Sequence, residues 1–133
     1  MPSPPRFPPE VLAAARKDLV IGLRAGTQPH RFIAVWAVVV EGRLFIRSWS
    51  LKPDGWTHAF RADPRGTVQV AGREYPVRAI RTRSDRLKDL VSRAYREKYH
   101  TPASRQYVRE MSSPKSRATT TEVAPLPSAR AGR

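Results

Sequence analysis

The stretch RSWSLKPDGW, from Arg47 to Trp56, gathers residue types that suit a phosphorylated aromatic ligand. It holds an arginine, a lysine, two serines and two tryptophans within ten residues. A guanidinium can bind phosphate oxygens through two parallel hydrogen bonds, and serine hydroxyls add further donors. The two indoles offer flat apolar walls to an aromatic ring. Arg61 and Arg65 follow closely enough in the sequence to face the same anion.

Arg47 supports an anion site because it is a charged residue within the apolar strand pattern RLFIRSW. Strand alternation places it on one face with Phe45 and Trp49. A buried guanidinium without a partner costs several kcal/mol, so Arg47 should either reach the end of the strand or meet an anion. Asp54 is the nearest carboxylate that could pair with it instead. The alternative is an ordinary turn, in which Trp56 packs under the next helix and the cations are solvated.

The sequence lacks the residues and motifs that most other kinds of catalytic site need. The chain has no cysteine, which excludes disulfides, thiolate metal sites and cysteine nucleophiles. His30, His58 and His100 do not have metal-ligand spacing. The sequence contains no nucleophile elbow, Walker loop or dinucleotide-binding glycine motif. We therefore predict no catalytic residue and no metal site, and expect a cofactor to carry any reaction.

The 133-residue chain is strongly basic, with a formal net charge of +14. Such a charge attracts anionic ligands and nucleic acids. The arginines are scattered from Arg6 to Arg133 without a dense block, so nucleic-acid binding is possible but not favoured. A nucleic-acid binder should form a long basic track in which Trp49, Trp56 or Phe60 stacks on bases. That track would also use four later arginines: Arg81, Arg83, Arg86 and Arg93.

No segment resembles a membrane span or a secretory signal. The longest apolar run, residues 32–40, is far shorter than the roughly 20 residues that a membrane helix needs. The N-terminus MPSPPRFPPE has no apolar core of a signal peptide. We expect a cytoplasmic protein.

Apolar periodicity predicts four helices and six strands. The helices are expected at residues 9–17, 55–63, 84–100 and 102–111. The strands are expected at residues 18–26, 31–40 (buried on both faces), 43–49, 66–71, 73–80 and 117–126. Glu41-Gly42 and Gly72-Arg73 are the expected hairpin turns. The helix that begins after Ser84 should bury a stripe of five residues: Leu87, Leu90, Val91, Ala94 and Tyr95.

These elements predict one domain of mixed α and β structure. Closing the strands into a small barrel removes exposed edges, and the long helix would cap that barrel. We expect a single domain over residues 10–125. Residues 1–9, which are rich in proline, and the small, basic segment 126–133 are expected to be disordered.

The order of these motifs resembles the flavin- and deazaflavin-binding split β-barrel superfamily. That superfamily includes pyridoxamine-phosphate oxidase and the deazaflavin-dependent nitroreductases. The nitroreductase pattern has a strand ending in serine, a glycine-rich loop, Trp-x-x-Asn-Leu-x-x-x-Pro and a second hairpin. Its matching residues here are Ser48, Gly55, Trp56, Ala59-Phe60 and Pro64. More closely, residues 18–125 resemble a family of short uncharacterised bacterial proteins, through AYREKY at residues 94–99 and SPKSRATT at residues 113–120.

The resemblance implies a six-stranded split barrel, commonly a homodimer, with a cofactor groove at or near the dimer interface. Carried over by position, the cofactor-binding residues are Arg47, Ser48, Ser50, Lys52, Trp56 and Arg61. Two departures remove polar groups from around that groove. Ala59 replaces the asparagine of the nitroreductase motif, and AGTQPH replaces its Arg-x-Ser-Gly turn.

Three functions remain open. In the first, Arg47, Lys52 and Arg61 hold the phosphate of FMN or the deazaflavin coenzyme, and the protein is an oxidoreductase. Ser48 and Ser50 would then hold the ribityl chain, with Trp56 as a groove wall. The second is a barrel without that cofactor that binds another small anion. The third is a nucleic-acid-binding module.

Overall fold

The computed structural model describes residues 5–27, 30–49 and 55–126. Five helices and seven strands lie in this part of the chain. The helices are α1 (Pro9–Lys17), α2 (Trp56–Ala62), α3 (Asp85–Lys98), α4 (Arg105–Met111) and α5 (Pro114–Ala118). The strands are β1 (Ile21–Ala25), β2 (Ile33–Val35), β3 (Ala37–Val40), β4 (Arg43–Ile46), β5 (Arg65–Val70), β6 (Arg73–Arg81) and β7 (Thr121–Pro125).

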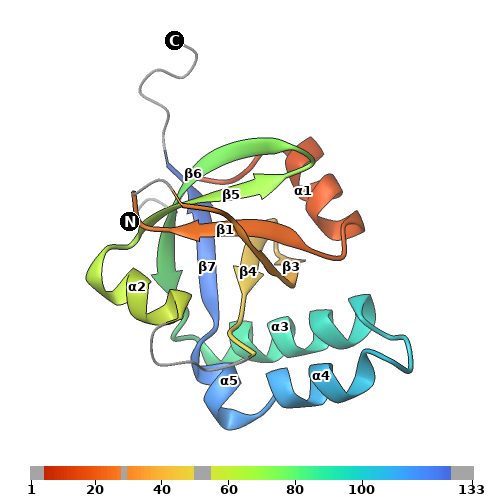
Figure 1. Cartoon of the computed structure of the whole chain (residues 1–133). Coiled ribbons are helices and arrows are strands. Elements are labelled where there is room, and N and C mark those ends of the chain that lie inside the picture. Colours follow the sequence, from red (N-terminus) through yellow and green to blue (C-terminus); the bar gives the residue numbers. More distant parts are fainter. Residues whose placement is uncertain (1–4, 28–29, 50–54, 127–133) are drawn as a thin grey trace.

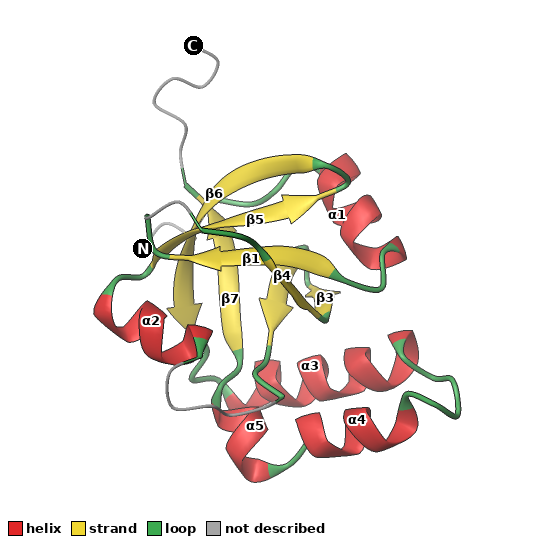
Figure 2. Cartoon of the chain, in the orientation of Figure 1, coloured by secondary structure: helices red, strands yellow, loops and turns green. Residues whose placement is uncertain are grey.

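The strands form one antiparallel sheet in the order β2-β1-β5-β6-β7-β4-β3. The two edge strands, β2 and β3, follow each other in the chain, so the sheet curls into a nearly closed barrel (Figure 1). Helices α3, α4 and α5 gather at one end of this barrel, while α1 and α2 lie at its sides (Figure 2). The expected split barrel is confirmed.

The barrel has seven strands rather than the six expected, because the predicted strand at residues 31–40 breaks at Trp36. β2 pairs with β1, whereas β3 pairs with β4. The carbonyl of Trp36 accepts a hydrogen bond from the Tyr95 hydroxyl at 2.7 Å, so helix α3 takes an acceptor that a continuous ladder would need. Burial on both faces holds for β3 but not for β2, where Ile33 is 48% exposed.

Both two-residue hairpin turns, between β3 and β4 and between β5 and β6, have residues with positive φ. Glu41-Gly42 joins β3 to β4 as expected, and both residues have positive φ. The β5–β6 turn is Ala71-Gly72 rather than Gly72-Arg73, because Arg73 already pairs with Val70. Ala71 and Gly72 have φ of 52° and 78°, as a two-residue hairpin turn that matches the strand twist requires.

Helix α3 confirms the predicted long helix and its apolar face. The Ser84 hydroxyl accepts a hydrogen bond from the Leu87 backbone N–H at 3.2 Å and caps the helix. Leu87, Val91 and Tyr95 are buried, and Leu90 and Ala94 pack half-buried beside them. The helix covers β3 and forms a second core outside the barrel, with residues of α4.

The N-terminal segment differs from the expected disorder over its described part. Phe7 is 4% exposed, lies in the barrel core and meets Tyr75 edge-on at 5.8 Å. The Arg6 guanidinium donates to the Glu41 carbonyl at 2.9 Å. A single buried aromatic therefore anchors a proline-rich segment whose composition alone predicts disorder.

The predicted last strand is shorter than expected. Residues 117 and 118 complete α5, and β7 begins at Thr121. Hydroxyls of Thr119 and Thr120 donate to the carbonyls of Ser116 and Arg117, which favours a turn over a strand here. Within the described residues, every helix is too short or too polar to cross a membrane.

Candidate functional site

A groove of about 340 Å³ lies at the helical end of the barrel, between β2, the end of β4, α2 and α4. We call it the aromatic groove. It is lined by Ile33, Ala34, Val35, Trp36, Arg47, Ser48, Trp49, Trp56, Tyr107 and Met111. Its volume lies at the lower end of the range for pockets that bind small molecules.

Ring contacts hold the aromatic walls of this groove in place. Trp36 stacks on Tyr99 with 4.0 Å between ring centroids. Tyr107 meets Trp36 and Trp49 edge-on, at 6.1 and 5.4 Å. The Trp49 indole N–H also donates to the Glu110 carboxylate at 2.6 Å. Trp49 and Tyr107 are 50% and 43% exposed, so both rings are available to a ligand.

Helix α2 carries the third indole, Trp56, and its position depends on Gly66. A Cβ atom at residue 66 would lie 2.9 Å from the Phe60 ring and 2.8 Å from the Arg24 carbonyl oxygen. Phe60 is buried in the barrel core and meets Trp56 edge-on at 6.0 Å. The absence of a side chain at Gly66 thus lets α2 pack closely enough to place Trp56 at the groove.

Arg47 is buried on the groove wall and has only 2% of its surface exposed. Its guanidinium makes four hydrogen bonds to neutral acceptors. They run from Nε to Thr120 Oγ1 (2.8 Å), from Nη1 to Ser92 Oγ (2.8 Å) and the Met111 carbonyl (2.9 Å), and from Nη2 to the Lys88 carbonyl (2.8 Å). These bonds tie the residue that follows β4 to α3, α4 and the residue that precedes β7.

The charge of Arg47 has no carboxylate partner within hydrogen-bond distance among the described residues. Burial lowers the pKa of Arg47 to about 10, and the negative charge of Asp89 offsets this only in part. The Asp89 carboxylate is itself paired with Arg117 at 2.9 Å. Asp54, the alternative partner expected from the sequence, lies outside the described residues. The groove wall therefore carries a positive charge whose direct hydrogen-bond partners among the described residues are all neutral.

The structure brings together three of the six predicted cofactor residues. Arg47, Ser48 and Trp56 line the aromatic groove. The Ser48 backbone N–H donates to Thr119 Oγ1 and its carbonyl accepts from Ser116 Oγ, which fixes the strand end against α5. Arg61 lines a second cavity, which adjoins the groove at Trp56. Ser50 and Lys52 lie outside the described residues.

The sequence interpretation missed Trp36, Tyr107 and Met111 as groove residues. Trp36 was hidden in an apolar run that reads as a buried strand, and Tyr107 in a short helix without a clear apolar stripe. The one available signal was Trp36 itself, a large indole among valines and alanines. The groove residues on β2 and at Trp36 are far in the sequence from those on α4, so no short sequence motif marks the groove.

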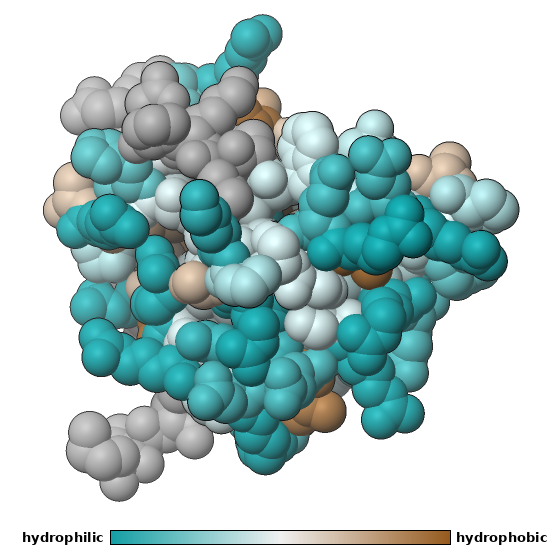
Figure 3. Space-filling view, turned by 90° about the horizontal axis from the view of Figure 1, so that it is seen from below, coloured by the Kyte–Doolittle hydropathy of each residue, from teal (hydrophilic) through white to brown (hydrophobic). Residues whose placement is uncertain are grey.

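The basic track that a nucleic-acid binder should show is partly neutralised. Arg86 forms an ion pair with Glu41, and Arg93 forms one with Glu97 at 3.1 Å. The face that α3, α4 and α5 present is nevertheless largely hydrophilic (Figure 3).

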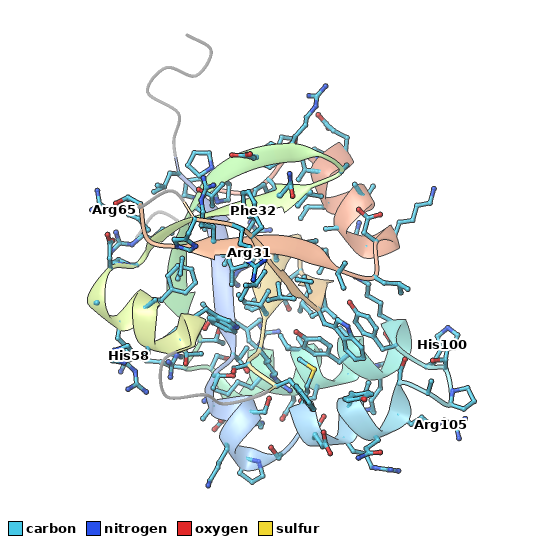
Figure 4. The ribbon with its side chains drawn as sticks, in the orientation of Figure 1. Arg31, Phe32, His58, Arg65, His100 and Arg105 are labelled. Carbon is cyan, nitrogen blue, oxygen red and sulfur yellow. The ribbon has the colours of Figure 1, made fainter. Side chains whose placement is uncertain are left out.

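Histidines do not converge on a site. His58 on α2 and His100 after α3 lie on opposite sides of the molecule (Figure 4). In the described part of the chain, no group of three His, Cys, Asp or Glu residues could hold a metal ion.

A family model described as an uncharacterised protein conserved in bacteria, DUF2255, matches residues 11–123. The chain belongs to this family. The resemblance to short uncharacterised bacterial proteins is thus confirmed. Among curated proteins, none matches this DUF2255 chain.

Solved structures share the fold of this DUF2255 chain at low identity. HutZ, the heme storage protein from Vibrio cholerae, has a TM-score of 0.64 and 12% identity, over 92% of each chain. An FAD-binding protein from Mesorhizobium loti has a TM-score of 0.58 and 14% identity, over 89% of this chain and 88% of that one. A pyridoxamine 5′-phosphate oxidase candidate from Listeria innocua has a TM-score of 0.56 and 15% identity, over 90% and 91%. These likenesses show the split-barrel fold.

Proposed function

We propose that this protein binds a phosphorylated flavin-type cofactor, FMN or a deazaflavin coenzyme, with its ring system in the aromatic groove. When bound, such a cofactor supplies hydride or two-electron transfer to a small substrate. The protein would then be a flavin- or deazaflavin-dependent oxidoreductase.

The observation that carries this proposal is a set of aromatic walls beside a buried, unneutralised cation. Trp36, Trp49, Trp56 and Tyr107 all line the aromatic groove, and Arg47 lies on its wall. Aromatic rings suit a planar ring system. A fixed positive charge beside a flavin favours its anionic reduced form, because charge near the ring nitrogens tunes the electronics of the cofactor.

Some of the predicted cofactor-binding residues would contact the cofactor directly, and one would act on it through its charge. Ser48 and Ser50 would hold the ribityl chain, and Trp56 would form a wall. Lys52 and Arg61 would hold the phosphate. Arg47 acts mainly through its charge, because protein acceptors already occupy four of its five N–H donors.

Heme is the competing planar ligand, since two of the similar solved structures are named for storing or binding it. No histidine of the described residues lines the aromatic groove, and histidine is a common axial ligand of heme iron. The residues therefore fit a flavin-type ring better than a heme.

The visible absorbance spectrum of protein purified from its native host separates these ligands, because flavin, deazaflavin and heme absorb differently. Colourless protein should be titrated with FMN, with the deazaflavin coenzyme and with hemin. Binding of hemin alone would contradict the proposal.

Tyr107 offers a matched pair of variants for the same titration. Tyr107→Phe keeps the ring and should bind the cofactor like wild type. Tyr107→Ala removes the ring and should weaken binding by about 1 kcal/mol or more. Equal affinities for both variants would show that the ligand lies elsewhere.

A barrel that binds a small anion without the cofactor is the second candidate. The buried charge of Arg47 and the net charge of +14 favour it. It predicts colourless protein that binds neither flavin nor deazaflavin but is stabilised by a small phosphorylated molecule.

A further inference from the structure

We infer that the cavity on the other side of Trp56 is a phosphate-binding site, which takes the phosphate of a ligand whose ring lies in the aromatic groove. This inference rests on the proposed function. The cavity measures about 280 Å³ and lies between α2 and the ends of β6 and β7. It is lined by Trp56, Thr57, Phe60, Arg61, Ala79, Arg81 and Thr121. We call it the arginine cavity.

The first argument is position. Arg81 is the last residue of β6 and shares a strand face with Val77 and Ala79, whose side chains pack in or against the barrel core. This face directs Arg81 toward the space beneath α2, where Arg61 approaches from the last turn of the helix. Two guanidinium groups thus converge on one cavity from different elements.

The second argument is charge. Six other arginines of the described residues have carboxylates within salt-bridge distance: Arg24, Arg43, Arg65, Arg86, Arg93 and Arg117. Arg61, Arg81 and the nearby Arg83 have none among the described residues, and no acid lines the arginine cavity. Burial and the positive charges of Arg61 and Arg83 lower the pKa of Arg81. An anion is the partner that would relieve this repulsion.

The third argument is size. The aromatic groove has room for a fused ring system, but its volume of about 340 Å³ leaves little for a phosphorylated side chain. Trp56 lines both the groove and the arginine cavity, so the two spaces adjoin. A ligand with a ring at one end and a phosphate at the other matches this pair. Thr57, whose hydroxyl is a neutral hydrogen-bond donor, also lines the cavity.

This arrangement assigns a role to Arg81 that the strand and turn motifs did not indicate. Guanidinium groups bind phosphate oxygens bidentately, so Arg61 and Arg81 together supply enough donors for a phosphate monoester. The Arg81 guanidinium donates one hydrogen bond among the described residues, to the Ala118 carbonyl at 3.1 Å, so most of its five donors remain for a ligand.

The test uses the full chain and compares FMN with riboflavin, which lacks the phosphate. The variants are Arg61→Gln, Arg81→Gln and their combination. Arg78→Gln is the matched control, because Arg78 is exposed on the same strand but does not line the cavity. Wild type and the control should prefer FMN. Each single variant should weaken FMN binding about tenfold, and the double variant should bind FMN no better than riboflavin.

A preference for FMN that survives in the double variant would overturn the inference and leave the proposed function intact. If wild type binds neither FMN nor riboflavin, the proposed function fails only when the deazaflavin coenzyme does not bind either, and the arginine cavity is tested with pyrophosphate alone. The NMR signals of the Arg61 and Arg81 Nε–H groups should then shift on addition of pyrophosphate, and those of Arg78 should not. Unchanged signals for Arg61 and Arg81 would overturn the inference.

Discussion

At the scale of single residues, Arg47 shows how a cation can serve the fold and the site together. Its side chain is among the largest that are fully buried, and it bonds to two hydroxyls and two carbonyls. The sequence predicted that a charge in this strand needs a partner. The structure supplies neutral partners from α3, α4 and the residue that precedes β7, so the positive charge persists beside the aromatic groove.

We expect Arg47→Ala to lower the free energy of unfolding by about 3–5 kcal/mol, because it removes four hydrogen bonds, three of them buried, and creates a cavity. Urea denaturation measures this loss. Lys88→Ala is the control, since only the backbone carbonyl of Lys88 contacts Arg47 and that carbonyl is retained. A near-normal stability of Arg47→Ala would show that its hydrogen bonds are not formed.

Lys98 predicts a dependence of stability on pH. Its ammonium group donates to the carbonyls of Ala15 and Ala37 at 2.8 and 2.7 Å, and burial lowers its pKa from 10.5 to about 8. Between these two values the unfolded chain binds more protons than the folded protein, so stability rises with pH.

The size of this rise is limited because Lys98 is only half-buried. After allowance for solvent screening, we expect wild type to gain about 1 kcal/mol relative to Lys98→Met between pH 8 and pH 10. Comparing the two proteins cancels the titration of other groups. A constant stability difference between them across this range would contradict the lowered pKa.

At the scale of elements, the break between β2 and β3 and its contacts with α3 fix the Trp36 wall of the aromatic groove. The break at Trp36 separates β2 from β3, and α3 uses the freed Trp36 carbonyl. Trp36 then stacks on Tyr99 from the end of α3. The same residue, Trp36, therefore marks the break in the strand and supplies one wall of the groove.

Two neighbouring residues of α3 test how this helix packs. Val91 is fully buried, whereas Leu90 is half-buried at the edge of the same core. Val91→Ala should cost about 2 kcal/mol in stability, through lost apolar burial and a cavity, and Leu90→Ala should cost less although it removes more atoms. Thermal or urea unfolding gives both values. The reverse order would mean that the helix is rotated about its axis.

At the scale of the whole molecule, large exposed apolar side chains lie just before β1 and on β2. Leu19, Val20 and Ile33 are 66%, 47% and 48% exposed, and β2 is an edge strand. Edge strands with apolar side chains favour pairing with another chain. We propose that this surface forms the homodimer that the superfamily resemblance implies.

Light scattering should therefore give twice the 15.0 kDa mass of one chain at micromolar concentration. Ile33→Lys should shift the protein toward the monomer, because it places a charge on the edge strand. Ala103→Lys is the control, because Ala103 is exposed in the turn between α3 and α4. A monomeric wild type would show that this surface does not pair with a second copy.

The sequence by itself determined the barrel class, the long helix and the family. These follow from local regularities, such as the Glu41-Gly42 turn and the apolar stripe from Leu87 to Tyr95, which depend on neighbours a few residues away. It also located Arg47 and Trp56 near one groove, because both belong to the short stretch RSWSLKPDGW at the end of the predicted strand.

Only the tertiary structure decided the rest, because those features join residues far apart in the chain. The four acceptors of Arg47 lie 41 to 73 residues away from it. The break at Trp36 involves the Tyr95 hydroxyl, and the packing of the described residues before α1 depends on Phe7, which lies in the barrel core. Arg61 and Arg81 face one cavity only because α2 packs over the ends of β6 and β7, a contact that no spacing in the sequence records.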